Sequence, residues 1–96
     1  MDFEWDEDKN RSNIAKHGVS FETATGIFQG PTLDLLDDRD DAGENRVVSI
    51  GMVRGIVILV VVHTDRNGVT RIISARPATR SERRRYGEEI RKRVDG

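Results

Sequence analysis

Seven consecutive apolar residues, Ile56 to Val62, constrain the fold of this chain more than any other feature. Most of them are β-branched, and their stiff χ1 rotamers suit a pleated strand that is buried on both faces. We therefore expect this run to be the central strand of a sheet. Asn67 and Gly68 adopt positive φ at low cost, so they predict a hairpin that returns the chain along Val69 to Arg76.

The other segments predict an α+β fold in a single domain spanning residues 1–96. The N-terminal part should contain a short edge strand, a helix running from the cap Asp6 to His17, and a shorter helix after the cap Ser20. Two further strands are expected at Thr32 to Leu36 and at Arg46 to Met52. With the central hairpin and a last helix, the order is β-α-α-β-β-β-β-α, and the helices pack on a mostly antiparallel sheet.

The last helix has a clear start signal. Thr79 and Glu82 have the spacing of a capping box, in which a hydroxyl and a carboxylate each bind a free amide of the helix start. The predicted helix runs from Arg80 to Val94. Its apolar residues recur every four positions and form one narrow stripe, made of Tyr86, Ile90 and Val94.

The charge of the chain is unevenly distributed. Residues 1–45 sum to −8 and residues 46–96 to +7, for a net charge of −1. Of the 16 cationic residues 13 are arginine, whose planar fork suits phosphate recognition. A nucleic-acid surface on the C-terminal half is one interpretation, and mutual neutralisation of the two halves is the other. The absence of cysteine and the acidic N-terminus favour a cytoplasmic protein with no membrane partner.

Two polar stretches have both a structural and a functional interpretation. The first helix places Lys9, Asn13 and Lys16 on one side, with His17 beside them. This stripe is either a solvated face or the wall of a cleft. The acidic stretch from Asp37 to Glu44 resembles a calcium loop only superficially, because Ala42 replaces a ligand and the bidentate glutamate is missing. We expect a solvated turn there.

Strand register predicts which side chains share a face. Two-residue loops at Arg54-Gly55 and Asn67-Gly68 would place Arg46 opposite His63, and His63 opposite Ile72. One face of the sheet would then carry Arg46, His63, Ser74 and Arg76. The other face would carry Val47, Val60, Val62, Ile73 and Ala75.

The inventory of reactive side chains excludes several chemistries. Two histidines without cysteine do not complete a typical closed zinc site, and no serine lies in an elbow motif, so we expect no metal and no cofactor. The arginines, lysines, histidines and Tyr86 suffice for metal-free RNA cleavage. That reaction needs a base for the 2′-hydroxyl proton, cations for the phosphorane charge and an acid for the leaving oxygen.

Three blocks of the sequence carry a family resemblance. They are FEWDEDKNRSNIAKHGVSFETA at 3–24, GENR at 43–46 and RIISARPATRSERRRY at 71–86. Together they resemble the BrnT toxins of bacterial type II toxin–antitoxin systems, which are related in fold to the RelE ribonucleases. The resemblance implies a cytoplasmic endoribonuclease toxin that halts translation. It also implies a BrnA-type antitoxin with a ribbon-helix-helix DNA-binding domain.

The candidate site combines one arginine with several proton acceptors. Arg76 lies at a strand end beside a helix N-terminus, where a phosphate can bind. Proton removal is left to His17, His63, Tyr86 or Glu82, because arginine stays protonated. We favour His17; His63 is alternatively a strand residue bonded to a carbonyl, and Tyr86 a core residue. The candidate RNA-binding residues are Lys9, Lys16, Arg46, His63, Arg71, Arg80 and Arg83.

Two other expectations concern partners. A non-catalytic module whose arginine helix docks a protein or RNA is the alternative to a ribonuclease. The central run is apolar on both faces, and three short helices leave part of it uncovered, so a partner should complete the burial. That partner is the antitoxin or a second copy of the chain, which makes a homodimer and a heterotetramer with antitoxin the oligomeric alternatives.

Overall fold

The computed structural model describes residues 1–37 and 45–95. Its elements follow the predicted order, with the second helix continued by a 3-10 turn. They are β1 (Asp2–Glu4), α1 (Glu7–His17), α2 (Phe21–Ala24), η1 (Thr25–Gln29), β2 (Thr32–Asp37), β3 (Arg46–Val53), β4 (Val57–Arg66), β5 (Val69–Pro77) and α3 (Arg80–Asp95). The acidic segment 38–44, where we expected a solvated turn, lies outside the described residues.

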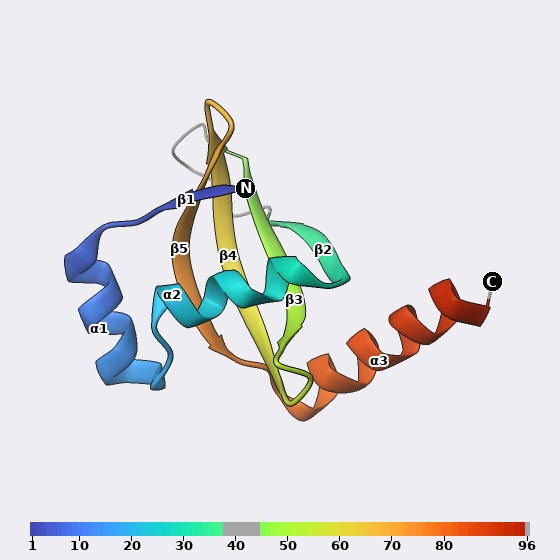
Figure 1. Ribbon diagram of the computed structural model, residues 1–96. Helices are drawn as coiled ribbons and strands as arrows, with labels where there is room; N and C mark the ends of the chain where they lie inside the picture. The colour runs from blue at the N-terminus through green and yellow to red at the C-terminus, as the bar shows by residue number, and fades with distance from the viewer. Residues whose placement is uncertain (38–44, 96) are drawn as a thin grey trace.

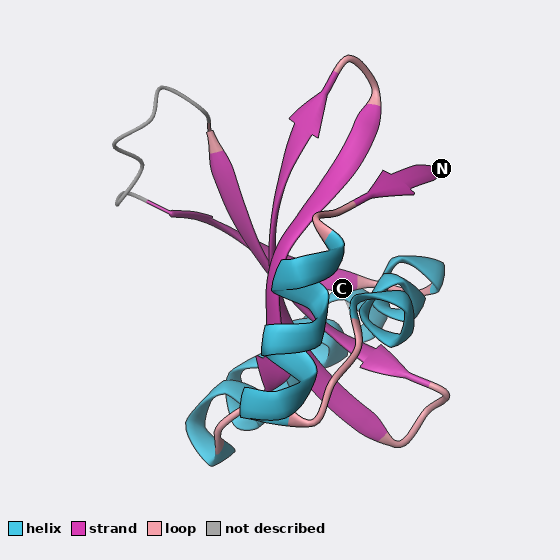
Figure 2. Cartoon of the chain, turned by 90° about the vertical axis from the view of Figure 1, so that its left-hand side faces the viewer, coloured by secondary structure: helices cyan, strands magenta, loops and turns pink. Residues whose placement is uncertain are grey.

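The strands form one sheet in the order β1-β5-β4-β3-β2. The pairings β2–β3, β3–β4 and β4–β5 are antiparallel, whereas β1 runs parallel to β5 at the sheet edge. The α+β class is therefore confirmed, and the sheet, which we predicted to be mostly antiparallel, is mixed because of the parallel β1–β5 pair. The parallel pair arises because the chain leaves β1, passes through α1 and α2, and returns to the far edge at β2 (Figure 1). The strands splay apart as the sheet twists (Figure 2).

The predicted helix boundaries are confirmed at their caps. The Asp6 side chain accepts hydrogen bonds from the backbone N–H groups of Asp8 and Lys9, and Gly18, with φ of 72°, caps the C-terminal end of α1. Ser20 accepts from the N–H of Thr23 at the start of α2. These caps satisfy amides and carbonyls that a helix end leaves free.

The register of the sheet differs from the prediction at two places. The Asn67-Gly68 hairpin has the predicted two-residue loop, and His63 lies opposite Ile72 as expected. The β3–β4 loop, however, contains three residues, since Val53 pairs with Val57, so Val47 rather than Arg46 lies opposite His63. A β-bulge at Val62/His63 then places Ser74 opposite Val62 instead of on the face of His63.

These two irregularities correct the predicted faces. Arg46, Ser74 and Arg76 do share one face, but Val60 and Val62 lie on it with them. His63 lies on the other face, together with Val47. A single-residue slip reverses the side of every residue beyond it, because side chains alternate along a strand.

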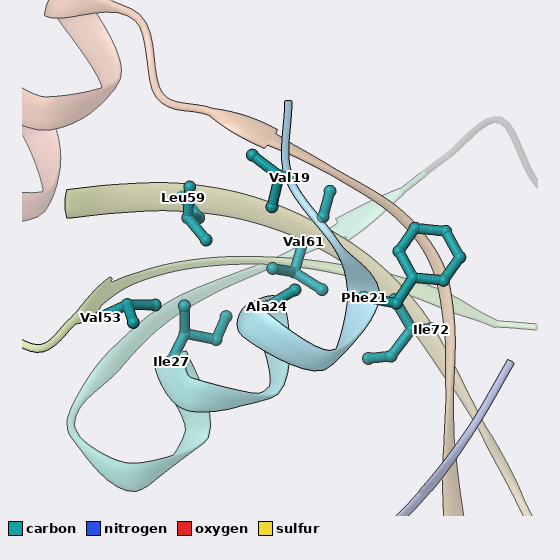
Figure 3. Packing of buried hydrophobic residues seen from close by; sticks show 9 residues of the cluster. Val19, Phe21, Ala24, Ile27, Val53, Leu59, Val61 and Ile72 are labelled. Atoms are coloured by element: carbon teal, nitrogen blue, oxygen red, sulfur yellow. The ribbon is translucent and has the colours of Figure 1, made fainter. Parts of the chain in front are cut away.

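Helices cover both faces of the sheet. On one face α2 and η1 bury a cluster whose members include Phe21, Ala24, Ile27, Leu59, Val61 and Ile72 (Figure 3). On the other, α3 buries Tyr86 against Leu33, Ile50, Val60 and Ala78. The middle of the central strand, Leu59 to Val61, is at most 2% exposed, so the chain itself covers much of the run for which we expected a partner. No helix in residues 1–37 and 45–95 is long and apolar enough to span a membrane.

Candidate functional site

Arg76 and Glu82 form an ion pair at the junction of β5 and α3. Nη1 and Nη2 of Arg76 each donate to one carboxylate oxygen of Glu82, both at 2.8 Å. The capping box predicted for Thr79 is present, because Glu82 Oε1 accepts from the N–H of Thr79 at 2.8 Å and Thr79 Oγ1 accepts from the N–H of Glu82 at 3.2 Å. The Glu82 carboxylate thus caps the start of α3 and also orients the guanidinium of Arg76.

The ion pair favours the charged form of both groups. The hydrogen bonds from Arg76, helped by the N–H of Thr79, lower the pKa of Glu82 to about 2, although partial burial opposes them. The hydrogen bond to Glu82 raises the pKa of Arg76. At neutral pH Glu82 is therefore a firmly ionised carboxylate and a weak proton acceptor.

Two further arginines flank this junction. Arg80 is exposed at the first residue of α3. Arg83, one turn on, donates from Nη1 to the carbonyl of Ala78 at 2.9 Å. We call the group Arg76, Thr79, Arg80, Glu82 and Arg83 the α3 corner. It presents guanidinium groups beside the positive end of a helix dipole, an arrangement that favours phosphate.

Tyr86 lies inside the protein, although it is only one turn beyond Glu82. Its side chain is 4% exposed, and its hydroxyl donates to the carbonyl of Pro31 at 2.8 Å. Burial raises the pKa of this phenol. The contacts match the core-packing alternative considered for Tyr86, with the hydroxyl bonded to the backbone rather than exposed.

A second group of cations surrounds a hollow beside α1. The α1 hollow has a volume of about 210 Å³ and is lined by Lys9, Ser12, Asn13, Lys16, His17, Ile73 and Ser74. The polar stripe of the first helix thus borders a hollow, while its cationic side chains stay in contact with solvent. Lys9, Lys16 and His17 are exposed at this wall, and β5 supplies the opposite side.

Asn13 holds α1 against β5. Its Nδ2 donates to the carbonyls of Ala75 at 2.7 Å and Val19 at 2.9 Å, and its Oδ1 accepts from the N–H of Ala75 at 3.2 Å. Asn10, also buried, accepts from the N–H of Phe21 at 2.8 Å. Neither role was predicted from the sequence. The signal was two asparagines inside a helix, where this residue is unfavourable unless its amide has a partner.

His63 belongs to neither cationic group. Its Nε2 lies 2.7 Å from the hydroxyl of Ser49, which donates to Asp34 Oδ1 at 2.6 Å, so the imidazole must supply the hydrogen between them. The ring also packs edge-on against Phe28, with centroids 5.0 Å apart. Burial lowers the pKa of His63, and the Asp34 carboxylate offsets part of the effect.

The remaining predicted residues are dispersed. Arg71 donates to Glu4 at 2.7 Å and so ties β5 to β1. Arg46 is the first residue of β3 and lies on the sheet face that α3 covers, opposite to the face of His63. In the part of the chain that the structure describes, no three histidine or carboxylate side chains gather to hold a metal ion.

The structure therefore assembles two groups that β5 connects. Ser74 lines the α1 hollow, and Arg76 of the α3 corner lies two residues further along the same face of the strand. Lys9, Lys16 and His17 form one group, and Arg76, Arg80, Glu82 and Arg83 form the other. Such an arrangement can hold consecutive phosphates of a polyanion and supply proton donors between them.

Comparisons with known proteins give a consistent picture. The sequence model for the ribonuclease toxin BrnT of type II toxin–antitoxin systems matches residues 5–82. The 1.1 Å crystal structure of the Brucella abortus ribonuclease toxin BrnT is similar, with a TM-score of 0.67 and 28% identity. That match covers 83% of this chain and 99% of the Brucella chain. No curated protein matches the sequence.

Proposed function

The chain belongs to the BrnT family of ribonuclease toxins from type II toxin–antitoxin systems, and we propose that it is a cytoplasmic endoribonuclease that cleaves RNA without a metal ion and so stops translation. One RelE-like toxin domain spanning residues 1–96 carries the activity. A BrnA-type antitoxin with a ribbon-helix-helix domain neutralises it, and the oligomeric alternatives are a homodimer of the toxin and a heterotetramer with the antitoxin.

The observation that carries this proposal is the alignment of two cationic groups along β5. The α1 hollow brings Lys9, Lys16 and His17 together, and the α3 corner adds Arg76 two residues beyond Ser74. An RNA strand bound along β5 would place one phosphate at Arg76 and its neighbours near Arg80 and Arg83. Guanidinium and ammonium groups can then stabilise the charge of the transition state.

The proposed reaction is internal transesterification. His17 removes the proton of a 2′-hydroxyl, whose oxygen bonds to phosphorus while the bond from phosphorus to the 5′ oxygen breaks. Lys9 or Lys16 protonates the departing 5′ oxygen, and the products are a 2′,3′-cyclic phosphate and a 5′-hydroxyl. Arg76 donates to the non-bridging oxygens, where negative charge develops.

The contacts of the remaining candidates suggest supporting roles. Glu82, with a pKa of about 2, orients Arg76 instead of accepting a proton. Tyr86 anchors α3 to the sheet through Pro31. His63 stabilises the interior through Ser49. Arg46 and Arg71 lie outside the two cationic groups, and any contact of theirs with RNA would be with a more distant part of the strand.

The deciding experiment analyses RNA ends. Purified toxin without antitoxin is incubated with structured RNA in EDTA, next to His17→Ala and Arg76→Ala. New 2′,3′-cyclic phosphate ends with the parent, and few with either variant, support the proposal. Tight RNA binding without new ends would instead support a non-catalytic binding module, whose arginines only hold phosphates.

A further inference from the structure

The tip of the β3–β4 hairpin exposes aliphatic side chains that the core leaves uncovered. Ile56 is 81% exposed and Val57 48%, whereas Leu59 is 1% exposed. The sequence run that begins at Ile56 is therefore buried in its middle and open at its first residues. Exposed aliphatic side chains mark a contact surface for another protein when they are part of a larger apolar surface.

A hollow of about 390 Å³ adjoins this pair. It lies between the α1–α2 turn and the hairpin, and its lining is mainly aliphatic, from Val19, Val53, Ile56, Val57 and Leu59. Val53 and Leu59 form the end of the buried cluster that lies away from Phe21 and Ile72 (Figure 3). The hollow is thus an opening onto the end of the core.

A second, polar hollow continues from the first. Its volume is about 440 Å³, it shares Thr23, Val53 and Arg54 with the apolar hollow, and it adds Glu22 and Gln29. Arg54 lies where the two meet. Any segment that spans both must be apolar at one end and polar at the other, with a group near the middle that complements a guanidinium.

The turn that presents these groups has an unusual backbone. Arg54 has φ of 56° and Gly55 φ of 69°, and the N–H of Ile56 donates to the carbonyl of Val53 at 3.1 Å. A left-handed conformation is unfavourable for arginine, and such strain tends to persist where it serves a function. Here it displays Arg54 and Ile56 at the tip, where neither side chain is buried.

We propose that these two hollows are the docking site of an amphipathic segment of the antitoxin. An apolar side chain fills the first hollow against Ile56, a carboxylate pairs with Arg54, and polar groups meet Glu22 and Gln29. RNA fits this surface poorly, because Arg54 is the one cation among the described lining residues and Glu22 would repel phosphate.

The position of the docking site also favours this partner. The hairpin tip lies at the same end of the sheet as the start of α3 (Figure 1), and the N–H of Ala78 donates to the carbonyl of Ile58 at 2.9 Å. A segment anchored at the tip can continue toward the α3 corner. The inference rests on the proposed function for its antitoxin, but Arg54 and Ile56 are not among the residues assigned to cleavage, although Gly18 in the lining directly follows His17.

The test separates neutralisation from catalysis. Ile56→Asp and Arg54→Glu toxins are titrated with the purified antitoxin of the same pair, and RNA cleavage is measured with and without it. The dissociation constant should rise by about 100-fold for Ile56→Asp and about 10-fold for Arg54→Glu, as expected at the centre of an interface. Cleavage without antitoxin should equal that of the parent, and an antitoxin variant with a new lysine should restore binding to Arg54→Glu.

Matched controls exist on the same chain. Leu36→Asp and Val94→Asp alter aliphatic residues that are 77% and 80% exposed but lie elsewhere, and they should bind antitoxin like the parent. Parent-like binding by both tip variants, or equal losses in the controls, would overturn the docking site. A second copy of the chain is the other possible occupant, and a mass measurement without antitoxin tests it. A dimer of the parent that Ile56→Asp dissociates would assign the surface to that second copy. A parent that binds antitoxin but cuts no RNA refutes the proposed function alone.

Discussion

Arg76 and Glu82 hold each other through two hydrogen bonds of 2.8 Å, so the guanidinium assigned to the transition state is already oriented before RNA binds. We predict that Arg76→Ala lowers kcat/KM for RNA cleavage by about 100-fold, the usual loss for one transition-state donor. Arg76→Lys should recover little, since an ammonium cannot reproduce the planar fork. Arg84→Ala, an exposed change on the same helix, serves as the control; equal rates for it and Arg76→Ala would remove Arg76 from the site.

Glu82 should make stability fall in acid. Its pKa in the folded protein is about 2, below the ordinary value of 4.5, so the unfolded chain takes up the proton first. The stabilisation is complete above about pH 4.5 and disappears as the pH falls toward 2. Denaturant unfolding of the parent should show this decline, and Glu82→Gln should reduce it. Identical slopes in the two proteins would mean that the ion pair contributes nothing in solution.

His63 should lower the free energy of unfolding already in weak acid, at a higher pH than Glu82 does. Burial lowers its pKa below the ordinary value of 6.5, so the unfolded state binds the proton more readily. The neutral imidazole therefore contributes fully to the free energy of unfolding above about pH 6.5, and this contribution declines below that pH. His63→Gln retains a donor for Ser49 but does not titrate, so its stability should vary less between pH 7 and 5. RNA cleavage at pH 7.5 should be unaffected, and a large loss of rate would return His63 to the site.

Tyr86→Phe distinguishes an anchor from a proton donor. The change removes the hydrogen bond to Pro31 and keeps the buried ring, so the free energy of unfolding should fall by about 0.5–1.5 kcal/mol. The cleavage rate at saturating RNA should stay within twofold of the parent. A rate loss of 100-fold or more, with stability unchanged, would show that the hydroxyl acts on RNA.

Substitution by alanine should destabilise the protein at Gly51 and stabilise it at Gly87. A Cβ on Gly51 would lie 2.7 Å from Cβ of Ile27, so Gly51→Ala must push η1 off the sheet, at about 1–3 kcal/mol. Gly87 lies inside α3, and its added Cβ would meet nothing within 4 Å. Gly87→Ala should therefore stabilise the protein by about 0.5–1 kcal/mol. Thermal unfolding of the two variants beside the parent measures both effects.

Much of the fold could be predicted from local sequence because its signals are local. Asp6, Ser20 and Thr79 act as helix caps as expected, and Asn67-Gly68 closes the predicted hairpin. Each of these depends on a few neighbouring residues. The parallel direction of β1 has no such signal, since it depends on where the whole chain returns.

The register could not be predicted beyond the first irregularity. Arg54 adopts a left-handed conformation and Ile56 joins the loop, which leaves three residues between the paired strands instead of two. The bulge at Val62/His63 follows no sequence pattern that we can identify. Of the predicted site, Arg76 with Glu82 and Lys9 with Lys16 and His17 do come together. The predicted face of His63 was wrong because of the same two irregularities, the three-residue β3–β4 loop and the bulge.

The contact between Asn13 and Ala75 joins residues 62 positions apart, and β1 pairs with β5 over a similar separation. One wall of the α1 hollow is therefore encoded at the start of the chain and the other near its end. During synthesis Lys9, Lys16 and His17 are made before Ser74 and Arg76 exist to face them. A nascent chain therefore cannot close the α1 hollow until residues of β5 have been made, so the hollow is among the last features of the fold to form.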